Sequence, residues 1–251
     1  MKLSKKLLTN PGYKNIVFDC DSTLTYIEGA DEIARLKGLG EEVAKITQRG
    51  MNGEINFAKS LYKRLDLIRP SLKDIDFLYR QYVGFLLADV PEVIGALNFI
   101  RKNIHIVTGG YQQAVERLAG YLGIRKSRVF GVHLKFGKSE DFIGFKKNHL
   151  TRNGGKAKVL RKIKKSGSTL FIGDGVTDLE AEGEVDLFVG FGGVIEREAV
   201  KSKAAFYVKS SSLSWVLPLS CSDREAQLLK NSEFSDLYGK GYNILRKIVR
   251  N

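Results

Sequence analysis

Residues 16–25 read Ile16-Val17-Phe18-Asp19-Cys20-Asp21-Ser22-Thr23-Leu24-Thr25. The apolar, β-branched run at the start predicts a buried strand that stops at two carboxylates, Asp19 and Asp21. Two anions this close repel each other, which costs stability unless a cation lies between them or one stays protonated. One carboxylate can then hold Mg²⁺ and act as a nucleophile while the other carries a proton. A β-turn rich in Asp and Ser is the alternative, and three further stretches argue against it.

The pattern changes to helical directly after this strand. Residues 26–88 carry apolar side chains at helical spacing, and Gly38, Gly40, Gly53 and Pro70 separate the segments. Helices are expected at residues 30–37, 41–49, 56–66 and 71–87. We interpret this block as a helical insertion over the carboxyl end of a sheet.

Past Pro91 the sequence alternates between strands and helices. Strands are expected at residues 104–107, 169–172, 187–190 and 206–208, and helices at 93–102, 112–122 and 155–165. Short alternating runs at 129–136 and 141–145 predict a β-hairpin. Strands that alternate with helices imply an α/β fold with a parallel sheet covered on both faces, whose ligands bind at the carboxyl ends of the strands.

The three further stretches place polar groups at that edge. Residues 108–110, Thr-Gly-Gly, offer a hydroxyl and N–H groups to an anion, although a tight turn has the same sequence. Lys156 starts a predicted helix after two glycines; it could hold a phosphoryl group or be one solvated lysine among several. Residues 173–178 add the carboxylates of Asp174 and Asp178. Four carboxylates in one crevice would require a divalent cation.

Composition limits the classes of protein. The chain has 251 residues, 43% hydrophobic and 27% charged, which is typical of a soluble globular protein. The net charge of +13 could attract nucleic acid or a membrane surface, but the lysines are spread along the chain, which favours a basic surface for small anions. Cys20 and Cys221 give neither a disulfide framework nor zinc spacing, residues 1–14 lack the apolar core of a signal peptide, and no run is long enough to cross a bilayer. A cytoplasmic location is therefore expected.

Together the four motifs resemble the signature of the haloacid dehalogenase (HAD) superfamily of phosphatases, and more closely that of the phosphoserine phosphatase family. The matching segments are Asp19-Cys20-Asp21-Ser22-Thr23, Glu28-Gly29-Ala30-Asp31-Glu32, 46–53, 64–68, 108–111, 134–136, 154–159, 173–181 and 190–193. The resemblance covers about residues 14–208 with short gaps. It implies a Rossmann-like core of residues 1–25 and 89–210 with a helical cap of residues 26–88 inserted after the first strand. Residues 211–251 form an extension without a counterpart, which could pack on the core, mediate an oligomer or touch the cap; helices are expected at 223–230 and 242–249.

The resemblance also implies roles for the core residues. Asp19 would be the nucleophile that forms an aspartyl-phosphate, and Asp21 would protonate the leaving oxygen and then activate water. Thr108 and Lys156 would bind the phosphoryl oxygens. The Mg²⁺ ligands would be Asp19, the backbone carbonyl of Asp21 and Asp174, with Asp178 in support.

Two cap residues would read the substrate. The resemblance implies that Glu28 faces an ammonium group and Arg64 a carboxylate, a combination that recognises an amino acid; the alternative is a pair of surface charges. Met51, Gly53, Gly109, Gly110 and Thr177 would complete the pocket. Asn52 stands where the family often has glycine and could narrow the pocket.

The activity implied by the resemblance is Mg²⁺-dependent hydrolysis of O-phospho-L-serine to L-serine and phosphate, in serine biosynthesis. Two alternatives stay open. One is a HAD phosphatase or phosphotransferase that uses another small phosphometabolite or an acceptor such as homoserine, and the other is a basic nucleic-acid-associated protein on the same scaffold. The expected partner is a small phosphorylated amino acid, with neither nucleic acid nor membrane, and a homodimer is a further expectation.

Overall fold

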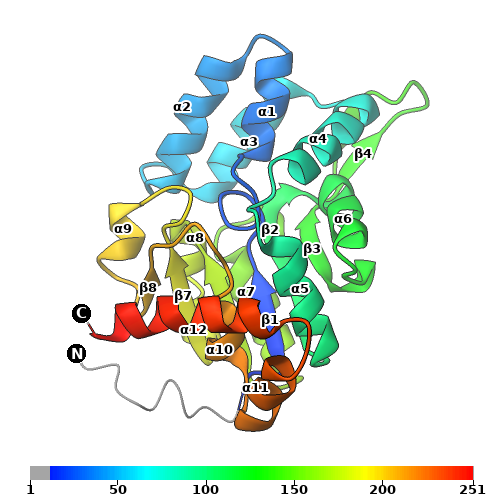
Figure 1. Cartoon of the computed structure of the whole chain (residues 1–251). Coiled ribbons are helices and arrows are strands. Elements are labelled where there is room, and N and C mark those ends of the chain that lie inside the picture. Colours follow the sequence, from blue (N-terminus) through cyan, green and yellow to red (C-terminus); the bar gives the residue numbers. More distant parts are fainter. Residues whose placement is uncertain (1–11, 251) are drawn as a thin grey trace.

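A parallel sheet forms the centre of the computed structural model, which describes residues 12–250. Within these residues the sheet has six strands in the order β3-β2-β1-β6-β7-β8 (Figure 1). Their bounds are Asn15–Phe18 (β1), Asn103–Tyr111 (β2), Val129–Val132 (β3), Thr169–Gly173 (β6), Leu187–Phe191 (β7) and Tyr207–Val208 (β8). After β1 the chain adds β2 and β3 on one side and then β6, β7 and β8 on the other. The order therefore reverses between β1 and β6, which is where ligands bind in sheets of this kind.

The two faces of the sheet pack against different helices. Ile16 and Phe18 of β1 belong to one hydrophobic cluster, which includes apolar residues of the helices Val90–Phe99 (α5) and Gln112–Tyr121 (α6). Val17 points to the opposite face and belongs to a second cluster with the helix Gly155–Lys164 (α7), as the alternation of side chains along a strand requires. The other helices of this part are Val176–Leu179 (α8) and Glu198–Lys201 (α9), with 3₁₀ turns at Lys126–Arg128 (η2), His149–Thr151 (η3) and Glu182–Glu184 (η4).

Four helices lie beyond the carboxyl ends of the strands (Figure 1). They are Gly29–Leu36 (α1), Gly40–Met51 (α2), Phe57–Ile68 (α3) and Leu72–Gly84 (α4), and each of them was expected. Two antiparallel segments connect them to the sheet: the N–H of Tyr26 donates to the carbonyl of Phe85 at 2.8 Å, and the N–H of Leu87 donates to the carbonyl of Leu24 at 3.0 Å. These paired segments fix where the four helices stand above the first strand.

The predicted hairpin was wrong in its first half. Residues Val129–Val132 form β3, the edge strand of the parallel sheet, and only Leu134–Phe136 (β4) pairs with Phe142–Phe145 (β5). Both halves of the run are apolar and alternating, so the sequence pattern carries no sign that the chain leaves the sheet after Val132. The hairpin reaches the helical block, because Phe145 packs edge-on against Tyr62 of α3 with ring centroids 5.1 Å apart.

The extension packs on the core, one of the three expectations for it. Its helices are Val216–Ser220 (α10), Asp223–Lys230 (α11) and Ser235–Arg250 (α12). Trp215 is fully buried with its ring centroid 6.2 Å from that of Phe191, and a partly buried ion pair joins Lys102 to Glu225 at 2.7 Å. Helix α12 starts earlier than expected, across Gly239 and Gly241, residues that disfavour helix. A Cβ at Gly241 would lie 2.1 Å from the carbonyl oxygen of Ser214, so close helix packing requires glycine there.

Replacement of Trp215 by alanine should lower the free energy of unfolding by about 3–5 kcal/mol, because a large buried ring leaves a cavity that the surroundings fill only in part. Urea unfolding of the whole chain measures the change. The matched control is Tyr242→Ala on the 41% exposed Tyr242 of α12, which should change stability by about 0.5 kcal/mol or less. If both variants lowered the free energy of unfolding by the same small amount, the extension would not be part of the hydrophobic core.

Candidate active site

Two strand ends bring three carboxylates together. Asp19 follows β1 and Asp174 follows the adjacent β6, and the N–H of Asp19 donates to the carbonyl of Ile172 at 2.9 Å. Carboxylate oxygens of Asp19, Asp174 and Asp178 all lie within 4.8 Å of one another, and the three residues are buried. Asp178 reaches this position because Gly173 has no side chain; a Cβ there would lie 2.4 Å from the Asp178 carboxyl carbon.

Lys156 belongs to the same cluster. Its Nζ lies 2.8 Å from Asp19 Oδ2 and 2.6 Å from Asp178 Oδ1, and its side chain is 6% exposed. Burial lowers the pKa of Lys156, but the carboxylates of Asp178 and Asp19 outweigh it and hold the pKa above the ordinary value. The sequence left open whether this lysine is solvated, and the structure shows that it is not.

The side chain of Asp21 contacts a different set of groups from that of Asp19. Its Oδ1 accepts hydrogen bonds from the Tyr82 hydroxyl at 2.7 Å and from the Gly29 N–H at 3.3 Å. Burial, with a smaller effect from the charge of Asp19, raises the pKa of Asp21 to about 7, although the Tyr82 hydrogen bond opposes the rise. A carboxyl group with this pKa can both give and take a proton near neutral pH.

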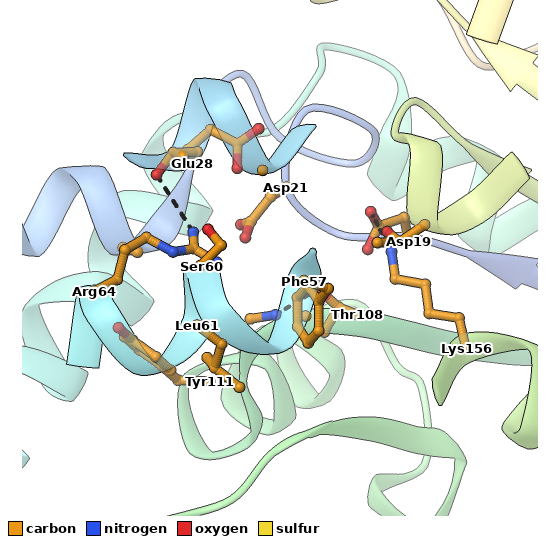
Figure 2. Close-up of a pocket in the computed structure, with 16 residues that line it drawn as sticks. Asp19, Asp21, Glu28, Phe57, Ser60, Leu61, Arg64, Thr108, Tyr111 and Lys156 are labelled. Carbon is orange, nitrogen blue, oxygen red and sulfur yellow. Dashed lines mark hydrogen bonds and ion pairs between the residues drawn. The ribbon is translucent and has the colours of Figure 1, made fainter. Parts of the chain in front are cut away.

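One small cavity of about 40 Å³ joins these groups to the helical block. Figure 2 shows Asp19 and Lys156 at one end, Arg64 and Tyr111 at the other, and Asp21 and Thr108 between them. The full lining is Asp19, Asp21, Glu28, Ala30, Thr47, Gly50, Phe57, Ser60, Leu61, Arg64, Thr108, Gly109, Gly110, Tyr111, Lys156 and Thr177. The structure therefore brings nine of the residues expected in catalysis or in phosphate and substrate binding into one space.

Two residues expected at the pocket, Asn52 and Gly53, lie outside the cavity lining. Both are exposed, so in this structure the Asn52 amide does not narrow the pocket. The side chain of Met51 lies outside the described part of the chain. Helix α2 ends at Met51, and Gly53 takes a φ of +77° directly after it.

Two charged residues, Glu28 and Arg64, line the end of the cavity that lies in the helical block. Glu28 Oε1 accepts from the Ser22 hydroxyl at 2.8 Å, and burial raises the pKa of Glu28 well above its ordinary value. Arg64 Nη1 donates to Thr47 Oγ1 at 3.4 Å. Among the described residues, Arg64 Nε and the Tyr111 hydroxyl are buried without a hydrogen-bond partner. Buried donors without partners are rare and point to a polar ligand.

Arg197 was not anticipated from the sequence. It precedes α9, is almost buried, and pairs through Nε with Asp174 Oδ2 at 2.9 Å and through Nη2 with Glu28 Oε1 at 3.2 Å. One arginine among 41 basic residues gives no sequence signal. Tyr82 and Ser60 were missed for the same reason, because single polar residues on helices reach the site only through tertiary packing. Thr47 and Tyr111 were also missed, although both lie within matching segments, 46–53 and 108–111, which could have pointed to them.

The charges of the site do not balance within the chain. Five carboxylates, those of Asp19, Asp21, Glu28, Asp174 and Asp178, face three basic groups, those of Lys156, Arg197 and Arg64. Burial raises the pKa of Asp178 and of Asp174, because a charged carboxylate is less stable away from water. Hard oxygen ligands with excess negative charge fit a divalent cation such as Mg²⁺, so the residues present suit a metal site.

The chain is similar to known hydrolases over most of its length. A family model described as haloacid dehalogenase-like hydrolase matches residues 13–182. The chain is 37% identical over 199 residues to the chloroplastic phosphoserine phosphatase of Arabidopsis thaliana, across 77% of this chain and 68% of the relative. It is 34% identical over 197 residues to the phosphoserine phosphatase of Homo sapiens, across 77% of this chain and 88% of the relative.

Solved structures agree with the sequence comparisons. A substrate-bound phosphoserine phosphatase complex superimposes with a TM-score of 0.72 at 28% identity, across 81% of this chain and 96% of that chain. A phospho-aspartyl intermediate analogue of phosphoserine phosphatase gives a TM-score of 0.71 at 28% identity, across 82% and 98%. The chain belongs to the haloacid dehalogenase-like hydrolase family. Within that family its similarity is to phosphoserine phosphatases, so the family and the α/β fold class predicted from the motifs are confirmed.

Proposed function

We propose that this chain is a Mg²⁺-dependent phosphoserine phosphatase, which hydrolyses O-phospho-L-serine to L-serine and phosphate. The observation that carries the proposal is a single buried cavity with a carboxylate–lysine pair at one end and groups for an amino acid, Glu28 and Arg64, at the other. The names of the relatives support the same reaction.

The reacting end would perform two displacements. Asp19 Oδ attacks phosphorus, the bond to the serine oxygen breaks, and that oxygen takes a proton from Asp21. Asp21 then takes a proton from water as the water attacks phosphorus, which releases phosphate and restores the Asp19 carboxylate. Lys156, 2.8 Å from Asp19, and Thr108 in the cavity wall would hold the phosphoryl oxygens.

The Mg²⁺ site would consist of Asp19 and Asp174, with Asp178 in support. The Asp21 side chain is engaged by Tyr82 and Gly29, so it would contribute its backbone carbonyl. Mg²⁺ bound there would neutralise charge that develops on the phosphoryl oxygens. Thr23 Oγ1 donates to Asp174 Oδ1 at 3.2 Å and would keep that carboxylate in place.

The recognition end would grip both charges of serine. The Arg64 guanidinium and the Tyr111 hydroxyl, which has no partner within residues 12–250, would donate to the substrate carboxylate, and Glu28 would face the ammonium group. The surface-charge alternative loses support because Glu28 and Arg64 both line the cavity. Glu28 also pairs with Arg197, which would orient it.

The remaining expectations concern partners and location. The polar groups that line the cavity suit a small phosphorylated molecule, and the expectation that the chain binds no nucleic acid stays a prediction. In residues 12–250, none of the helices combines the length and the apolar character needed to span a bilayer. The homodimer and the cytoplasmic location stay predictions, to be tested by light scattering and by fractionation of the source cells.

A substrate panel tests the function. With Mg²⁺ present, phosphate release from O-phospho-L-serine should exceed release from sugar phosphates and nucleotides by at least about tenfold in kcat/KM, because only phosphoserine meets both Glu28 and Arg64. EDTA should abolish the activity and added Mg²⁺ should restore it. Added homoserine should leave phosphate release unchanged; its phosphorylation would indicate a phosphotransferase. Preference for a sugar phosphate, or salt-sensitive binding of DNA or RNA without turnover, would contradict the proposal.

A further inference from the structure

Tyr82 is a buried side chain that the reaction outlined above does not use. It lies in the last turn of α4, directly before the segment that returns to the sheet, and it is fully buried. Its hydroxyl donates to Asp21 Oδ1 at 2.7 Å. Tyr82 is not part of the cavity lining, so it reaches the reaction only through Asp21.

The two oxygens of the Asp21 carboxyl group have different surroundings. Oδ1 accepts two hydrogen bonds, from Tyr82 and from the Gly29 N–H. Among residues 12–250, Oδ2 accepts none, and it faces the phosphate-binding turn: a Cβ at Gly110 would lie 3.4 Å from Asp21 Oδ2 and 3.3 Å from Thr108 Oγ1. Because an oxygen that accepts two hydrogen bonds cannot also offer a proton along them, Oδ2 is the oxygen free to exchange a proton with a bound phosphate ester.

Close packing holds the Tyr82 hydroxyl in place. A Cβ at Gly29 would lie 2.2 Å from the Tyr82 oxygen and 3.2 Å from Leu78 Cδ1, and a Cβ at Gly110 would lie 3.2 Å from that oxygen. The two glycines therefore leave room for this hydroxyl and for little else. A buried hydroxyl with a short hydrogen bond and no freedom to rotate away is suited to fix the rotamer of its partner.

We propose that Tyr82 is a positioning residue for catalysis: its hydroxyl fixes the Asp21 carboxyl group so that Oδ2 faces the leaving oxygen of the substrate. The inference rests on the proposed function. In the first displacement Oδ2 gives its proton to the serine oxygen as the bond from that oxygen to phosphorus breaks. In the second, Oδ2 takes a proton from the attacking water. Tyr82 itself exchanges no proton and keeps its hydrogen bond throughout.

The test is Tyr82→Phe, which removes the hydroxyl and keeps the buried ring. The value of kcat/KM for phosphoserine should fall about tenfold, the cost of losing one hydrogen bond to an ionisable group. For 4-nitrophenyl phosphate, whose leaving group departs without a proton, kcat/KM should fall about twofold or less. The dissociation constant of inorganic phosphate should not change, because Tyr82 does not line the cavity.

A double-mutant cycle and a matched control complete the test. In an Asp21→Asn background, Tyr82→Phe should cause no further loss, since the residue acts only through Asp21. Tyr207→Phe removes another buried hydroxyl, one without a partner among the described residues, and should leave the ratio of the two substrates as in wild type. Equal losses for both substrates, no loss, or a further loss in the Asp21→Asn background would overturn the inference. If the proposed function is wrong, the wild-type chain itself will not hydrolyse phosphoserine. In that case phosphoserine is replaced, in the comparison with 4-nitrophenyl phosphate, by the alkyl phosphate that the wild type does hydrolyse.

Discussion

Asp19→Asn should reduce phosphate release from phosphoserine on the order of 10⁴-fold or more, as removal of a covalent nucleophile does in other enzymes. An amide nitrogen or carbonyl oxygen cannot form the aspartyl-phosphate. The variant also removes one negative charge from the cluster with Asp174 and Asp178, which would weaken the hold on Mg²⁺. Both effects act on the same step, so the loss should far exceed that of any variant at the recognition end.

The measurement combines turnover with trapping of the intermediate. Acid quenching of wild-type enzyme during turnover should yield a chain heavier by one phosphoryl group, located at Asp19 by peptide mass spectrometry. The Asp19→Asn chain should show no such species. The matched control, Asp236→Asn, changes an exposed aspartate in α12 and should retain wild-type turnover. Substantial turnover by Asp19→Asn, or a phosphoryl group on another residue, would show that Asp19 is not the nucleophile.

The carboxyl ends of the strands could be predicted from the sequence because the pattern that marks each of them is local. An apolar run that stops at Asp19, and another that stops at Gly173 before Asp174, identify buried strands and the polar groups at their ends. Parallel strands align their carboxyl ends at one edge, so local patterns sufficed to place the acidic cluster. The helices of residues 26–88 were predicted for the same reason, since amphipathic spacing is visible within each segment.

The features that sequence reasoning missed depend on contacts between distant segments. Tyr82 meets Asp21 from 61 positions away, and Arg197 meets Glu28 from 169 positions away. Nothing near Tyr82 or Arg197 in the sequence distinguishes them from other tyrosines and arginines. The status of Lys156 was open for the same reason, because its burial is set by Asp19 and Asp178 on other elements. Patterns within one element predict its type, whereas only packing decides which of its polar side chains enter the site.

Arg64→Ala should lower kcat/KM for phosphoserine about a hundredfold, mainly through KM, because a charge-assisted pair with the substrate carboxylate is lost. For O-phosphoethanolamine, which has the ammonium group and the phosphate but lacks the carboxylate, the same variant should lose about threefold or less. The wild-type preference for phosphoserine over O-phosphoethanolamine should therefore largely vanish in the variant. Lys63→Ala, at an exposed neighbour on α3, is the matched control and should keep the wild-type preference.

The comparison of these two substrates separates recognition from folding and from chemistry. A variant that merely loosened α3 would lower kcat/KM for both substrates together. Such loosening should be small, because among the described residues the Arg64 guanidinium makes one long hydrogen bond, to Thr47 at 3.4 Å, and its Nε has no partner, although the charge of Asp31 on α1 also attracts it. Its truncation thus removes little that holds α3 in place. Parallel losses for phosphoserine and O-phosphoethanolamine would mean that Arg64 does not bind the carboxylate, and the amino-acid substrate would then lose its main structural support while the role of Asp19 stood unchanged.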